Sequence, residues 1–157
     1  MRTRLTVAIA LAAALACLTG CSAYRSPRFE VVGVEEVERT EDAIVLNFAL
    51  SAKNLNQEPL PLRRADYRLV LDGVEVFRGS RSAEAVVRRF GEQSIVLPAV
   101  VPADRFDLGR FESDAELPYR LRGRVEYITP GELAEVLFDT GIRRTKASIA
   151  VEGVIDL

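Results

Sequence analysis

Large apolar side chains at every second position are the feature that most restricts how this chain can fold. The clearest case is the segment 43–52, whose alternating residues are Ile44, Leu46, Phe48 and Leu50. Successive side chains of a strand point to opposite faces, so this spacing predicts a strand with one face in a core. A helix would instead require apolar residues three and four positions apart.

A second alternating segment contains its own turn. The dipeptide Asp72-Gly73 is flanked by apolar residues, namely Leu69, Leu71, Val74 and Val76. Asp-Gly is favoured in two-residue hairpin turns because both central residues need a positive φ. We expect Leu71 to lie opposite Val74 and Leu69 opposite Val76. All four side chains, together with Tyr67, would then share one face.

Further strands are predicted at 29–37, 93–100, 117–128 and 147–157. The alternation of the first breaks near Gly33, which indicates a β-bulge. In the third, one side consists of Tyr119, Leu121, Gly123, Val125 and Tyr127, and the other of Arg120, Arg122, Arg124 and Glu126. That division predicts one buried face and one solvated face.

One short helix is predicted near residue 130. The run Thr129-Pro130-Gly131-Glu132 has the pattern of a capping box with proline at the first helical position. An apolar side would be formed by Leu133, Val136 and Leu137, and Gly141 would end the helix. About seven strands with this one helix predict an all-β protein, an antiparallel β-sandwich of the fibronectin type III or immunoglobulin-like kind.

The first twenty residues have a different chemistry. Arg2 and Arg4 precede an uncharged apolar run at 7–18, which is shorter than the roughly 20 residues that a membrane-spanning helix needs. The run Leu18-Thr19-Gly20-Cys21 resembles the lipobox of bacterial lipoproteins. We therefore expect residues 1–20 to be a lipoprotein signal peptide, and Cys21 to carry fatty acyl chains such as palmitate. A plain secretory signal is the alternative, and it leaves Cys21 as an unexplained thiol.

Several expectations follow from cleavage before Cys21. Residues 21–27 would be a lipidated N-terminus with a short tether, and residues 28–157 would form one domain within roughly 20 to 25 Å of the bilayer. Cys17 would be lost with the signal, so no internal disulfide is expected. Ser22, in place of an aspartate, favours the outer membrane over the inner membrane. The expected location is thus the cell envelope, lipid-anchored and facing the periplasm.

Residues 46–100 carry a resemblance to a known family. The segments that match are 48–56, 60–62, 66–73 and 93–98. They resemble the late embryogenesis abundant (LEA) group 2 family, also called the water stress and hypersensitive response (WHy) domain. The family usually has Asn-Pro-Asn where this chain has Asn54-Leu55-Asn56. The resemblance implies a fibronectin-like sandwich with a small helix, a role in desiccation and stress tolerance, and no shared catalytic residues.

The residue types that most enzymes and metal sites use are scarce. The chain has no histidine, and the thiol of Cys21 would be blocked by lipid, so nucleophile-base pairs and transition-metal sites lack their parts. Glycine-rich phosphate loops are also missing. Loss of Arg2 and Arg4 would leave 19 basic and 23 acidic residues, a net charge of −4, which does not favour nucleic acid. We expect no enzyme, no cofactor and no metal.

Three functions remain open at this point. The first is a non-enzymatic envelope module that protects neighbours under stress or binds other envelope proteins. The second is a carrier for a lipid or another apolar ligand, which would need a cavity between the sheets. The third and least favoured is a hydrolase that uses two converging carboxylates.

Three polar clusters are candidate binding sites. Asn54 and Asn56 form a candidate interaction loop, although shaping the turn between two strands is the favoured role. Two basic clusters could bind anions, although solvated strand edges are favoured for both. Their members are Arg63, Arg64 and Arg68, and Arg143, Arg144 and Lys146.

Overall fold

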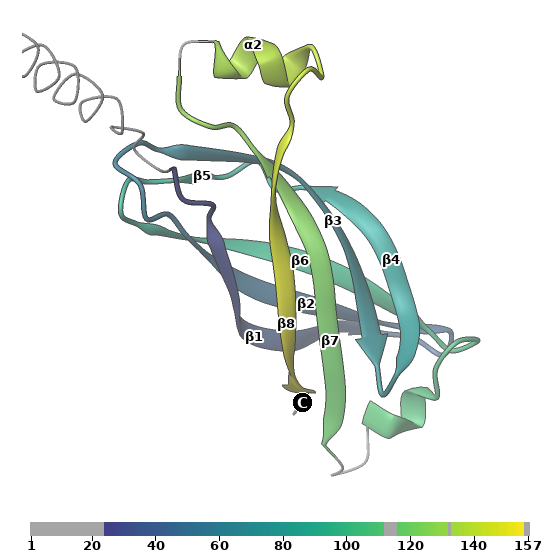
Figure 1. The fold of residues 1–157 in the computed structure, drawn as a ribbon. Coiled ribbons are helices and arrows are strands. Elements are labelled where there is room, and N and C mark those ends of the chain that lie inside the picture. The colour runs from purple at the N-terminus through teal and green to yellow at the C-terminus, as the bar shows by residue number, and fades with distance from the viewer. Residues whose placement is uncertain (1–23, 112–115, 132, 156–157) are drawn as a thin grey trace, which may run out of the picture.

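The computed structural model describes residues 24–111, 116–131 and 133–155, which form two antiparallel sheets packed face to face (Figure 1). The smaller sheet has the order β1 (Arg28–Arg39), β2 (Ala43–Lys53), β6 (Glu92–Pro102). The larger has the order β4 (Val74–Ser82), β3 (Leu60–Leu71), β7 (Leu117–Tyr127), β8 (Thr145–Ile155), and the two-residue β5 (Val86–Val87) pairs with β3. The predicted antiparallel β-sandwich is confirmed.

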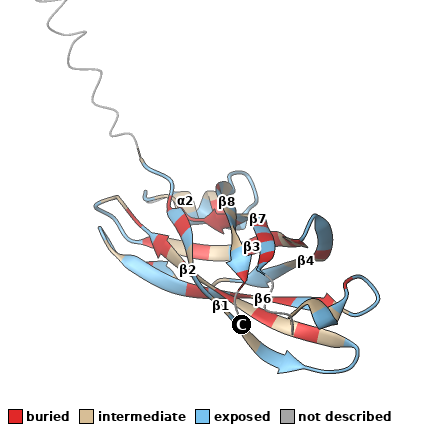
Figure 2. Cartoon of the chain, turned by 90° about the horizontal axis from the view of Figure 1, so that it is seen from below, coloured by how far each residue is buried: buried red, intermediate tan, exposed pale blue. Residues whose placement is uncertain are grey.

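The core lies between the two sheets, as the alternation predicts. In β2 the inward residues Ile44, Leu46, Phe48 and Leu50 are completely buried, and Figure 2 shows buried residues gathered between the layers. The rings of Phe48 and Tyr119 come from opposite sheets and lie 5.3 Å apart. Four pockets of the described residues, by contrast, are open to solvent. The packed core therefore does not support the ligand-carrier function.

Strand β1 is irregular where the sequence predicts a bulge. Its pairing with β2 shifts register between Val31 and Gly33, which confirms the bulge. Val32, the extra residue, is 64% exposed. A second shift surrounds Val37, which leaves that side chain half exposed as well. The bulges let an edge strand carry β-branched residues on both faces without extending the core.

The hairpin between β3 and β4 is partly as expected. Asp72 and Gly73 have φ angles of 44° and 84°, and Leu71 pairs with Val74. Leu69 pairs with Phe77, so the prediction of Val76 as its partner is wrong. A bulge adds Val76 to β4, where it is buried, while Val74 is 45% exposed. The expected single face for all four residues fails because the bulge changes the alternation of this edge strand.

The division of β7 into two faces is confirmed with one exception. The inward tyrosines, Leu121 and Val125 are buried, whereas Glu126 on the opposite face is also buried. Its carboxylate lies 3.1 Å from the Lys146 ammonium and 4.0 Å from the Arg144 guanidinium. Burial of the carboxylate is compensated by these two cations. The expected strand at 147–157 is β8, and residues 156 and 157 lie outside the described residues.

The short helix exists, but its start and its buried side differ from the prediction. Helix α2 (Ala134–Asp139) begins after Leu133, and no side chain caps its first turn. Glu132, which would complete the capping box, lies outside the described residues. The prediction that Gly141 ends the helix is confirmed by its φ of 73° and its N–H bond to the carbonyl of Phe138.

The sandwich covers only part of the predicted apolar side of α2, because Leu137 is half-buried while the other two members are exposed. Phe138 is buried and lies 5.6 Å beneath the Arg144 guanidinium. Leu133 and Val136 are 69% and 56% exposed, so most of the predicted apolar side faces solvent. The helix lies beyond the ends of the strands (Figure 1), where Phe138 is its buried side chain and Glu135 lies 3.6 Å from Arg63 of β3. A second helical turn, the 3-10 helix η2 (Leu108–Phe111), lies at the opposite end.

Candidate functional site

Cys21 and the lipobox residues Leu18, Thr19 and Gly20 precede the described residues, so lipidation remains a prediction. Within the described part of the chain, none of the helices has the length and apolar character needed to cross a membrane. What the structure does describe is how the chain enters the fold after Cys21, and this entry is the starting point of the candidate site.

The chain is packed on the sandwich from Tyr24 onward. The Tyr24 ring stacks on the Tyr127 ring, with 6.3 Å between centroids. The hydroxyls of Ser26 and Tyr127 lie 3.1 Å apart in a hydrogen bond, and Pro27 is buried. Residues 24–27 are therefore part of the folded domain, although the sequence suggested a tether that runs to residue 27.

Asn56 holds the backbone of this entry segment. Its side-chain Nδ2 donates to the Arg25 carbonyl at 2.7 Å, and its Oδ1 accepts from the Arg25 N–H at 2.9 Å. Burial raises the pKa of the neighbouring Tyr24 phenol, and the interaction with Tyr127 raises it further. The Tyr24 phenol therefore stays neutral at ordinary pH.

Asn54 organises the loop that supports Asn56. It is fully buried, and its Nδ2 lies 2.7, 3.2 and 3.3 Å from the carbonyl oxygens of Glu58, Arg88 and Val87. Its Oδ1 accepts from both the backbone N–H and the side-chain amide of Asn56, each at 2.9 Å. These bonds are the ones that a turn-shaping role requires. Binding of a partner to this loop stays a prediction.

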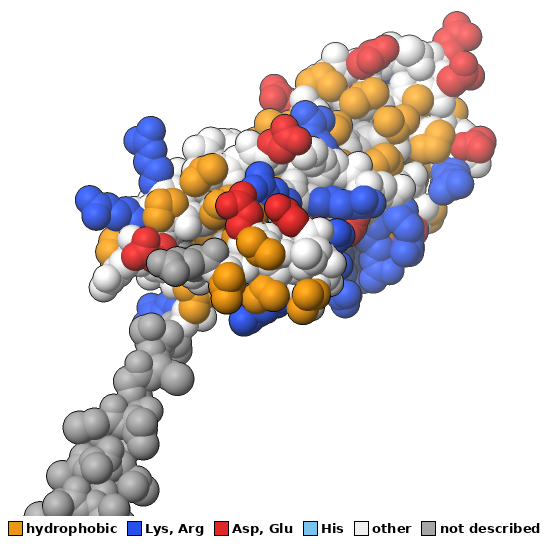
Figure 3. Space-filling view, turned by 90° about the horizontal axis from the view of Figure 1, so that it is seen from above, with side chains coloured by type: hydrophobic (Ala, Val, Ile, Leu, Met, Phe, Trp, Pro, Cys, Tyr) orange, Lys and Arg blue, Asp and Glu red, His pale blue; other side chains and the backbone are white. Residues whose placement is uncertain are grey.

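The end of the sandwich that holds the entry segment also exposes large apolar side chains. Figure 3 looks down on this end and shows apolar and basic side chains around the point where the chain enters. The exposed fractions are 66% for Phe90, 69% for Leu133, 56% for Val136 and 74% for Ile142. One pocket joins Tyr24, Phe90 and Arg143, so these segments are neighbours in space. We call Phe90, Leu133, Val136 and Ile142 the apolar tip.

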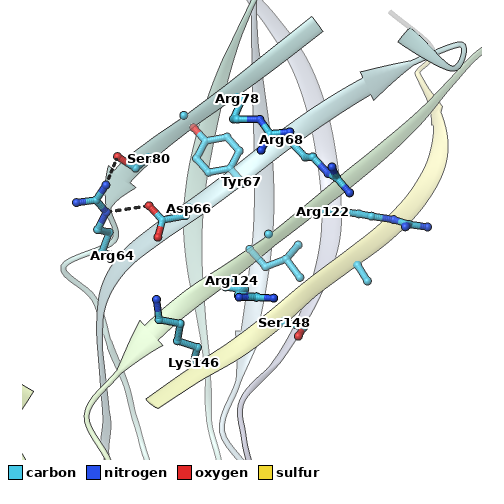
Figure 4. Close-up of a pocket in the computed structure, with 14 residues that line it drawn as sticks. Arg64, Asp66, Tyr67, Arg68, Arg78, Ser80, Arg122, Arg124, Lys146 and Ser148 are labelled. Atoms are coloured by element: carbon cyan, nitrogen blue, oxygen red, sulfur yellow. Dashed lines mark hydrogen bonds and ion pairs between the residues drawn. The ribbon is translucent and has the colours of Figure 1, made fainter. Parts of the chain in front are cut away.

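A second feature is a basic depression on the outer face of the larger sheet (Figure 4). Its volume is about 800 Å³. Six cationic side chains and one acidic side chain line it, namely Arg64, Arg68, Arg78, Arg122, Arg124, Lys146 and Asp66. We call this the arginine depression. The sequence pointed to Arg64 and Arg68 but grouped them with Arg63, which turns instead toward Glu135 of α2 at 3.6 Å.

The sequence missed this cluster because its members are far apart along the chain. Pairing of β3 with β4 and β7 places Arg68 opposite both Arg78 and Arg122. The only signal in the sequence was the charged side of strand 117–128, and nothing indicated that it would lie beside Arg68. The second predicted cluster is also divided, because Lys146 lines the depression while Arg144 packs on Phe138.

The described residues contain no group of three or more carboxylate, cysteine or histidine side chains placed to bind a metal ion. A run of acids lies on β1, namely Glu35, Glu36 and Glu38. Glu36 forms an ion pair with Arg39 at 2.6 Å. That bond lowers the pKa of Glu36, whereas a general acid would need a raised one.

Comparisons with known proteins agree with this fold. The family model for late embryogenesis abundant protein (LEA_2) matches residues 49–139, more than half of the chain. A solution structure from Arabidopsis thaliana has a TM-score of 0.65 at 17% identity, covering 88% of this chain and 89% of that one. Another solution structure, of a protein assigned as late embryogenesis abundant, has a TM-score of 0.62 at 15% identity, covering 99% and 85%.

A crystal structure of a protein from Archaeoglobus fulgidus is also similar, with a TM-score of 0.56 at 10% identity, covering 83% of this chain and 98% of that one. At such identities the three structures establish a shared fold. No curated protein sequence matches the chain. The match to the family model, which runs from within β2 to the end of α2, shows that this chain belongs to the late embryogenesis abundant LEA_2 family.

Proposed function

We propose that this protein is a non-enzymatic envelope lipoprotein in which lipid on Cys21 holds a stress-protective LEA_2 (WHy) domain against a membrane. Membership of the family supports a stress-related role, and LEA_2 proteins are generally not enzymes. The lipobox and Ser22 support lipidation and an outer-membrane location facing the periplasm. Protection during water loss and binding of other envelope proteins are the two activities that such a module could carry out.

The observation that carries the proposal is the packing of Tyr24 on Tyr127. Three residue steps separate Cys21 from Tyr24, and an extended chain covers at most about 3.6 Å per residue. Lipid on Cys21 would therefore hold the folded domain within roughly 10 Å of the bilayer surface. That distance is half or less of what a tether up to residue 27 would allow.

The apolar tip indicates which end of the domain would face the membrane. A domain held so closely must present one end to the lipid, and the entry point of the chain selects the end that carries α2. Exposed apolar residues at that end favour the interfacial region of a bilayer, and neighbouring cations such as Arg25, Arg89 and Arg143 favour anionic headgroups. We therefore propose that the apolar tip rests on the membrane.

Replacement of the lipidated cysteine tests the anchor. Cys21→Ser should release the protein from membranes into the soluble fraction after a high-salt wash, and mass spectrometry of the wild type should show an acylated N-terminal cysteine. Retention of the Cys21→Ser protein on washed membranes, or an unmodified Cys21 in the wild type, would end the lipoprotein proposal.

A second experiment tests the orientation separately. In the Cys21→Ser background, Val136→Gln with Ile142→Gln should weaken binding to anionic vesicles, because about 1 to 3 kcal/mol of apolar transfer is lost per buried side chain. The matched control is Val74→Gln with Val154→Gln, which changes two exposed valines at the far end of the sandwich. Equal vesicle binding by both pairs would show that the tip does not touch lipid, even if Cys21 is acylated.

A further inference from the structure

The arginine depression contains an arrangement that costs stability in the absence of a ligand. Arg68 of β3 lies directly opposite Arg78 of β4 and also opposite Arg122 of β7. Three guanidinium groups thus form one row across three neighbouring strands, on the solvated face of the sheet (Figure 4). Like charges placed directly opposite on a sheet are destabilising.

Carboxylates at the border compensate only part of this repulsion. Glu75 accepts two hydrogen bonds from Arg78, at 2.8 and 2.9 Å, and lies 3.6 Å from Arg68. The bonds from Arg78 lower the pKa of Glu75. On the other side Glu152 lies 3.2 Å from Arg122 but is shared with Arg120 at 3.4 Å. Two carboxylates are therefore shared among four arginines, namely Arg68, Arg78, Arg120 and Arg122. Neither carboxylate lines the depression.

The rest of the arginine depression leaves one cation without a carboxylate. Arg64 is bound to Asp66 at 2.8 Å, and Lys146 reaches the buried Glu126 at 3.1 Å. Arg124 forms no ion pair with any of the residues that the structure describes. Its neighbours across the sheet are Asp66 and Ser148. Arg124 is thus available to an external anion.

We propose that the arginine depression binds a ligand with several phosphate groups. Guanidinium groups form paired, charge-assisted hydrogen bonds to phosphate oxygens. A chain of phosphates bound along Arg78, Arg68 and Arg122 would place a negative charge between neighbouring arginines and so remove the repulsion between them. Ser80 and Ser148 at the rim add hydroxyl donors. The local charge is notable because the mature chain is acidic overall.

The chemistry of the lining excludes base recognition. Proteins that bind single-stranded nucleic acid stack its bases on exposed aromatic rings. The one aromatic residue that lines the depression is Tyr67, which is buried and donates its hydroxyl to the Pro98 carbonyl inside the core. The proposed ligand is therefore recognised by its phosphate groups without base stacking, and a lipid headgroup and a soluble phosphate compound are the two sources to distinguish.

Inorganic tripolyphosphate and vesicles distinguish these two sources. Full-length protein, purified in detergent, would be titrated with tripolyphosphate by calorimetry at low salt. We expect saturable binding that Arg68→Gln and Arg122→Gln each weaken about tenfold, which corresponds to about 1.4 kcal/mol. The matched control is Arg120→Gln, since Arg120 shares Glu152 with Arg122 and is similarly exposed but lies outside the depression. It should change the affinity by less than about twofold.

Co-sedimentation of the Cys21→Ser form with phosphatidylglycerol vesicles provides the second arm. Vesicle binding that Arg122→Gln weakens, that Arg120→Gln leaves unchanged and that tripolyphosphate reduces would identify a lipid headgroup as the source. Tripolyphosphate binding without such vesicle binding would identify a soluble phosphate compound, and both outcomes support the site. Equal weakening by Arg120→Gln and Arg122→Gln, or no saturable binding to either ligand, would overturn it. None of these outcomes depends on whether Cys21 is acylated.

Discussion

Asn54→Ala is the substitution for which the structure makes the sharpest stability prediction. The Asn54 side chain is completely buried and joins five hydrogen bonds, three as donor to carbonyl oxygens and two as acceptor from Asn56. Alanine leaves these groups without partners in a closed loop. A buried polar group left unsatisfied costs about 1 to 3 kcal/mol.

The expected loss can be bounded from these contacts. Some of the freed groups will admit water, so we do not expect the full sum. The short bonds, to the Glu58 carbonyl at 2.7 Å and from the Asn56 N–H at 2.9 Å, contribute most. Together they predict a decrease of about 3 kcal/mol in the free energy of unfolding. For a domain of this size that corresponds to a decrease of roughly 10 °C in Tm.

Urea unfolding followed by far-UV circular dichroism measures this loss, since the chain has no tryptophan to report by fluorescence. Gln57→Ala is the control, because Gln57 is an exposed residue of the same loop, and it should change stability by less than about 0.5 kcal/mol. A loss below about 1 kcal/mol for Asn54→Ala would refute the structural role assigned to Asn54.

Three further predictions concern the turn between β3 and β4 and the larger sheet. Gly73→Val should lower stability by about 1 kcal/mol or more because φ is 84° there, while Gly73→Asn should be milder in the same thermal melt. Gly123→Ala should lower the free energy of unfolding by about 2 kcal/mol, since the added Cβ would lie 2.5 Å from the Asp66 carbonyl oxygen. Gly33→Ala is the control, because there is open space around Gly33. Equal Tm values for the two variants would count against this packing. Burial raises the pKa of Tyr67 to about 12 from about 10 in an unfolded chain. The folded state therefore holds the Tyr67 proton more tightly than the unfolded chain does. The stabilisation from this group is fully present below pH 10, and up to about 3 kcal/mol is lost as pH rises through 12. Tyrosinate absorbance that titrates fully near pH 10 in the folded protein would contradict this.

The candidate sites could be predicted only in part. The side-chain bonds of Asn54 are those expected of an asparagine that shapes a turn, because such residues bond to backbone groups nearby. The apolar tip could not be predicted, since Leu133 and Val136 have the spacing of a buried helical face. A periodic pattern identifies an apolar side but does not say whether a sheet lies within reach of it.

What the sequence determined by itself is the strand content and the positive-φ turn at Gly73. Both depend on neighbours within a few residues, where alternation and backbone freedom act directly. Strand register beyond the turn and the order of strands were decided only by the tertiary structure: the bulge that shifted Val76, and the sheet order that set Arg68 between Arg78 and Arg122. Register and order across a sheet depend on contacts between residues distant in the chain, because the core must be filled by both sheets at once.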